Sequence, residues 1–154
     1  MLAGGSTLDK QGVFVVSDLH LGGSDQPGPF GFQKCSPSCQ QRFCHFVDWL
    51  CEHPDRKERE FHLVLNGDLV DFLCEEPFVS FRAHDTAATD KLQRIINRYA
   101  DVWAALARVV QMGIRVTILL GDSDLELSFP GSRRLLFDSL GPGRIEFIYD
   151  NQAL

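Results

Sequence analysis

The chain has 154 residues, a length that suits a single domain. Hydrophobic residues make up 44% and charged residues 23% of it, which is ordinary for a globular protein and excludes a disordered chain. The net charge of −6 disfavours non-specific binding to nucleic acid or anionic lipid, but it does not oppose divalent cations. No apolar run is long enough to span a bilayer and no signal peptide is recognisable, so we expect no membrane association and a cytoplasmic location. The five cysteines are odd in number, and we expect them to be reduced.

Strands that alternate with helices are predicted along the chain. Short apolar runs of the kind buried on both faces of a sheet predict strands at 12–17, 61–65 and 114–120, and a fourth strand is expected at 144–149. Helical spacing of apolar residues predicts helices around 43–50, at 86–112 and at 132–140. Gly113 stands where a glycine commonly ends a helix. This order predicts an α/β domain with a mostly parallel sheet.

Acidic clusters directly follow three of the predicted strands. They are Asp18 with His20, Asp68 with Asp71, and Asp122 with Asp124. Ligands of open α/β sheets bind beyond the carboxyl ends of the strands, so we expect the three clusters to converge on one crevice. Like charges in one crevice repel, and a bound cation relieves that repulsion. Carboxylates with one imidazole suit Mn²⁺, Fe or Zn²⁺ better than Ca²⁺.

The motifs around these clusters resemble those of a known family. The segments 17–22 (SDLHLG), 66–71 (NGDLVD) and 121–124 (GDSD) are similar, in order and spacing, to the first three blocks of the calcineurin-like metallophosphoesterases. The resemblance covers residues 13–127. It implies an α-β-β-α sandwich and hydrolysis of a phosphate mono- or diester by a water that two divalent metal ions activate.

The same resemblance implies a role for each residue of the motifs. Asp18 and His20 would bind the first metal ion, Asp68 would bridge the two ions, and Asp122 would bind the second. Mn²⁺ is the favoured ion, with Fe or Zn²⁺ as alternatives. Asp71 would support a metal ligand from behind, which we favour, and an acidic residue stabilised by a helix dipole is the alternative.

Two departures from the family pattern affect the expected activity. Ser123 and Asp124 stand in the catalytic block, but Ser123 occupies the place of a histidine, and a serine hydroxyl cannot supply the charge or the proton of an imidazolium. The later histidines of the family have no counterpart, since His84 is the last histidine. We therefore expect residues 1–154 to form a C-terminally incomplete domain, the N-terminal half of the sandwich. Its open sheet face would be covered by a second copy or by the missing half.

Three other interpretations stay open at this stage. A catalytically degenerate phosphoesterase fold could serve as a binding or scaffold domain. The segment Gly121–Leu125 superficially resembles the nucleophile block of Gly-Asp-Ser-Leu serine esterases, although such an enzyme needs a histidine near its serine. A zinc knuckle can also be imagined from a group of residues at unusual spacing, Cys35, Cys39, Cys44 and His45.

Overall fold

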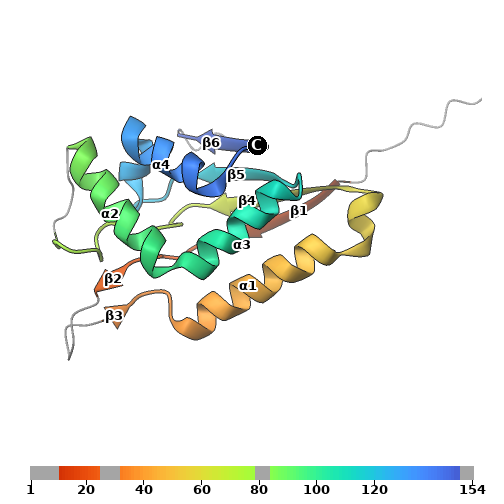
Figure 1. Ribbon diagram of the computed structural model, residues 1–154, viewed down its shortest axis with the longest axis horizontal. Helices are drawn as coiled ribbons and strands as arrows, with labels where there is room; N and C mark the ends of the chain where they lie inside the picture. The colour runs from red at the N-terminus through yellow and green to blue at the C-terminus, as the bar shows by residue number, and fades with distance from the viewer. Residues whose placement is uncertain (1–10, 25–31, 79–83, 150–154) are drawn as a thin grey trace, which may run out of the picture.

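A four-stranded parallel sheet is the framework of the computed structural model, which describes residues 11–24, 32–78 and 84–149. The strands stand in the order β1 (Gln11–Val16), β4 (Glu60–Asn66), β5 (Arg115–Leu119) and β6 (Ile145–Ile148) (Figure 1). Every adjacent pair is parallel, with Val15 opposite Val64 and Val64 opposite Thr117. The predicted α/β class and the parallel sheet are confirmed.

Four helices connect these strands, two of them in succession between β4 and β5. They are α1 (Pro37–Glu52), α2 (Asp85–Arg98), α3 (Ala100–Gln111) and α4 (Pro130–Leu140). The sequence analysis did not foresee the short elements β2 (Gly23–Ser24), β3 (Phe32–Gln33), η1 (Pro54–Lys57) and η2 (Leu125–Ser128), of which β2 and β3 pair antiparallel. Within the described ranges, no helix is both long and apolar enough to cross a membrane.

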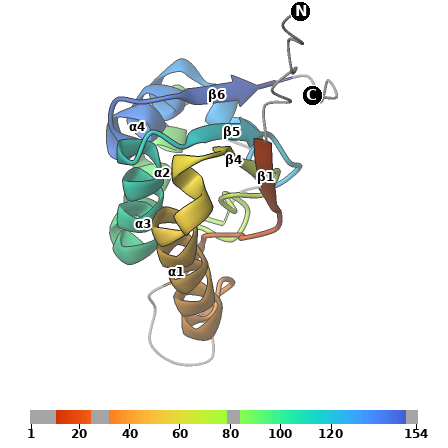
Figure 2. The ribbon, with the colours of Figure 1, turned by 90° about the vertical axis from the view of Figure 1, so that its right-hand side faces the viewer.

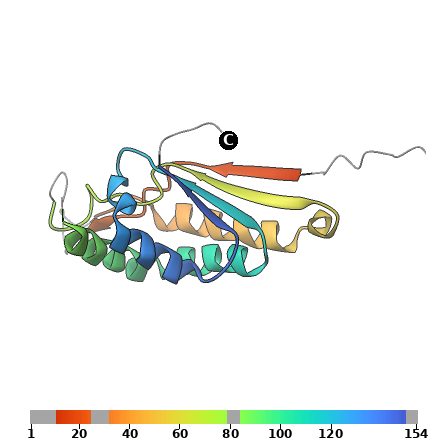
Figure 3. The same cartoon turned by 90° about the horizontal axis from the view of Figure 1, so that it is seen from above.

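All four helices lie against the same face of the sheet (Figures 2 and 3). That face carries the alternate strand residues that enter the core, among them Leu63, Leu65 and Ile118. On the opposite face of β1, Val13 and Val15 remain 54% and 62% exposed. The prediction that this strand is buried on both faces is therefore wrong, because β1 is an edge strand and no described helix covers its outer face.

The single helix predicted at 86–112 is in fact two helices. Tyr99 separates α2 from α3, with φ −107° and ψ 36°, outside helical values. Its ring is 1% exposed, and its hydroxyl donates a hydrogen bond of 2.6 Å to the carbonyl oxygen of Gly22. The apolar period continues through the break, since Leu92, Ile95 and Trp103 are all buried. Periodicity alone therefore gave no sign of the bend.

Candidate metal centre

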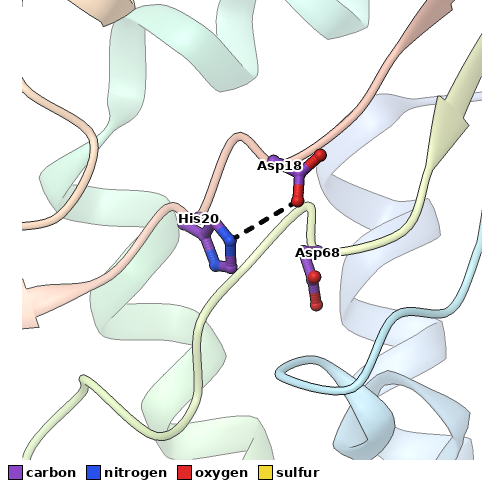
Figure 4. Close-up of side chains that lie close together, drawn as sticks. All are labelled: Asp18, His20 and Asp68. Carbon is purple, nitrogen blue, oxygen red and sulfur yellow. Dashed lines mark ion pairs between the residues drawn. The ribbon is translucent and has the colours of Figure 1, made fainter.

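Three of the predicted ligands meet at the carboxyl ends of β1 and β4. Asp18 and His20 follow β1, Asp68 follows β4, and one ligand atom from each lies within 4.8 Å of the others (Figure 4). The Nε2 atom of His20 is 3.8 Å from Oδ1 of Asp18. Across the described ranges, this is the one group of three or more histidine, cysteine or acidic side chains close enough to share a metal ion. One imidazole and two carboxylates form a donor set that suits a transition metal.

The backbone holds these three residues in an uncommon conformation. Asp18, His20 and Asp68 are the non-glycine residues of the described chain with positive φ, at 58°, 47° and 52°. Such a conformation costs free energy and is concentrated at functional sites. It is fixed by hydrogen bonds between the two loops, since the N–H groups of His20 and Leu21 donate to the carbonyl oxygens of Asp68 and Leu69, at 2.8 Å and 3.0 Å.

Asp71 contacts the back of the His20 ring. Its carboxylate is 1% exposed, and its Oδ2 atom lies 3.2 Å from Nδ1 of His20. A proton on Nδ1 satisfies this contact, and the Nε2 lone pair is then left on the side of Asp18. Asp71 is thus placed to set the tautomer that a metal-binding imidazole requires.

Lys34 belongs to the same network, and the sequence analysis missed it. Its Nζ donates a 2.6 Å hydrogen bond to Oδ2 of Asp71, the oxygen that also faces His20. Burial raises the pKa of Asp71, but the hydrogen bonds from Lys34 and from the N–H of Cys74 outweigh it and bring that pKa below its ordinary value. The lysine lies just after β3, a strand that no sequence pattern indicated.

Replacing Lys34 with methionine should destabilise the fold by about 1–2 kcal/mol at pH 7, a cost reduced by the 42% exposure of the lysine. A depressed pKa contributes stability that is present above the unfolded value near pH 4 and is lost as the pH falls through the folded pKa. The difference between variant and parent should therefore shrink on acidification below about pH 4. Urea unfolding in EDTA measures this, with Arg134→Met as the control, because the Arg134–Asp138 pair is exposed (85% and 70%). An equal loss at every pH would contradict the role given to Lys34.

The 121–124 segment packs against Asp68. The hydroxyl and the N–H of Ser123 both donate to Oδ1 of Asp68, at 2.6 Å and 3.0 Å. Burial raises the pKa of Asp68, but these two hydrogen bonds hold it below the ordinary value. A Cβ atom on Gly121 would stand 2.2 Å from the same oxygen, so only glycine fits there. Ser123 is thus a partner of Asp68 rather than an exposed group.

The two acidic residues of this segment have different surroundings. Asp124 is 0% exposed and accepts hydrogen bonds from the N–H groups of Gly121, at 2.7 Å, and Leu69, at 2.9 Å. Burial raises its pKa to about 6, against the opposing effect of these hydrogen bonds. Asp122, by contrast, is exposed and stands outside the three-residue group. The structure therefore gathers three of the four predicted metal ligands.

The geometry also bears on two of the alternatives. Ser123 does have a histidine near it, since its Oγ lies 3.4 Å from Nδ1 of His20. That nitrogen is shared with Asp71, however, and the hydroxyl is 4% exposed and donates to Asp68, which is unlike an activated nucleophile. Cys35 precedes α1 and Cys39 lies in its first turn. In the described chain, neither belongs to a group of side chains close enough to share a metal ion.

Two comparisons with known proteins were negative. No family model matches the chain, and no curated protein is similar to it at a significant level. Fold and site together define an α/β protein with a candidate metal centre at the carboxyl edge of its parallel sheet.

Proposed function

We propose that this chain is the N-terminal half of a calcineurin-like metallophosphoesterase domain and acts in the hydrolysis of a phosphate mono- or diester. The observation that supports this most directly is the meeting of Asp18, His20 and Asp68, which come from two separate motifs. The order of the motifs predicts only that these residues follow strands. In the structure, one ligand atom from each also lies within 4.8 Å of the others, as a metal-dependent hydrolase needs.

The donor set fits a divalent ion. Two atoms bound to one ion at about 2.1 Å lie at most about 4.2 Å apart, so the observed group needs only small side-chain rotations to close around it. Asp18, His20 and Asp68 would hold the ion, which would act as a Lewis acid toward a phosphoryl oxygen and activate a water. Asp71 keeps the proton on Nδ1 of His20, and Lys34 keeps Asp71 ionised.

Titration with Mn²⁺ by calorimetry tests the proposal, with Asp68→Ala in parallel. We expect the parent chain to bind Mn²⁺ and the variant to bind it at least about 100-fold more weakly, because losing only an outer-shell partner already costs about 10–100-fold. Asp138→Ala, an exposed acidic residue on α4, is the matched control and should bind like the parent. Equal binding by Asp68→Ala would remove the basis of the proposal.

A binding or scaffold role is the second candidate, and Ser123 is the observation that favours it. The hydroxyl is turned to Asp68, and a serine cannot donate a proton to a leaving group near neutral pH as an imidazolium can. Turnover of an aryl phosphate by the Mn²⁺-loaded chain separates the two candidates. Asp122 and Ser123 stand where the resembled family has an asparagine and a histidine. If the chain binds metal without turnover, and Asp122→Asn together with Ser123→His brings turnover back, the chain is a catalytic scaffold that these two residues have silenced.

A further inference from the structure

We infer that this chain holds one divalent ion rather than two, with Asp122 outside the ligand set. The inference rests on the proposed function, since it concerns the stoichiometry of the same metal centre. The family resemblance implies a pair of ions bridged by Asp68. The described residues that surround Asp68 do not fit a second ion.

The first reason is the shortage of donors on the side of the 121–124 segment. A second ion needs about three protein ligands to be held firmly. Asp122 is exposed and is not part of the three-residue group. Asp124 is buried, and its two oxygens are used by the N–H groups of Gly121 and Leu69. Among the residues that the structure describes, Asp68 alone remains as a well-placed carboxylate on this side.

The second reason is that the oxygen of Asp68 on that side is already occupied. Oδ1 accepts from both the hydroxyl and the N–H of Ser123, which uses the two lone pairs of that atom. Gly121 closes the approach further, because its Cα lies so near that an added Cβ would reach within 2.2 Å of Oδ1. We therefore assign the other oxygen, Oδ2, to the ion that Asp18 and His20 share.

The third reason is that Ser123 is itself held in place. The carbonyl oxygen of Ser123 accepts from the N–H of Phe72 at 3.0 Å, which ties the segment to the loop after β4. The side chain is 4% exposed. A second ion at Oδ1 would have to displace both of these hydrogen bonds from a buried residue, and hydrogen bonds to a carboxylate are stronger than those between neutral groups.

The experiment counts the ions on the full chain and asks whether Asp122 binds one. Calorimetry should give one Mn²⁺ per chain, and electron paramagnetic resonance should show the six-line spectrum of an isolated Mn²⁺. Asp122→Asn should bind Mn²⁺ within twofold of the parent, whereas Asp68→Asn, which keeps the side-chain shape, should lose at least tenfold in affinity.

Each departure from this result has its own meaning. Two ions per chain with an exchange-coupled spectrum would overturn the single-ion inference, a tenfold loss in Asp122→Asn would overturn the exclusion of Asp122, and either would leave the proposed function standing. An absence of Mn²⁺ binding in the folded parent chain would overturn both. The two failures are thus distinguished by the number of ions bound.

Discussion

Replacing Asp124 with asparagine should lower the free energy of unfolding by about 2–4 kcal/mol at neutral pH. Both oxygens of this buried carboxylate accept backbone hydrogen bonds, one from Gly121 and one from Leu69. An amide of the same shape offers one oxygen and one NH₂ group, so one of these two N–H donors would face another donor inside the protein. Urea unfolding followed by circular dichroism measures the loss.

The same substitution should weaken the metal centre. Leu69 directly follows Asp68 and Gly121 packs against the Asp68 carboxylate, so Asp124 fixes the position of that ligand from both loops. We expect Mn²⁺ affinity to fall by about 10–100-fold, as for other residues that support a ligand. Asp138→Asn is the control, because that carboxylate is 70% exposed and should tolerate the change. Parent-like stability in Asp124→Asn would show that the buried carboxylate does not join the two loops.

The sequence predicted the features that depend on the spacing of hydrophobic residues and on the positions where the strands end. Apolar runs located three strands of the sheet, the fourth was expected near the end of the chain, and the carboxyl-edge rule placed Asp18, His20 and Asp68 together. The spacing of the motifs also singled out Asp71, which the structure puts against His20. These inferences succeed because each depends on residues close together in the sequence and on the regular geometry of a parallel sheet.

Other features depend on contacts between distant residues, which the sequence pattern does not carry. The bend at Tyr99 is tied to Gly22, 77 positions earlier, by a hydroxyl hydrogen bond. Lys34 reaches Asp71 because β3 pairs with β2, and a strand of two residues is too short to show an alternating pattern in the sequence. The place of Asp122 outside the three-residue group depends on the orientation of the 121–124 loop, which local spacing does not specify.

The second large effect is expected at Glu75, in the loop that carries Asp68 and Asp71. Its carboxylate is 0% exposed and pairs with Arg98, which is 8% exposed, and with Arg94 from the same helix, α2. Replacing Glu75 with glutamine would remove the buried carboxylate charge that faces the guanidinium of Arg98. We expect this to destabilise the fold by about 3–5 kcal/mol, the usual cost of breaking a buried ion pair from one side.

The Glu75 substitution should affect stability more than metal binding. The loop would still be held to α2 by Lys91, whose Nζ donates to the carbonyl oxygen of Phe72 at 2.7 Å. Mn²⁺ affinity of the folded variant should therefore fall less than in Asp124→Asn. The loss of stability should persist in 0.5 M salt, because a buried pair is screened far less than a surface pair. Disappearance of the effect at high salt would mean that the Glu75 pairs act as surface ion pairs, and the loop would then be anchored chiefly by Lys91.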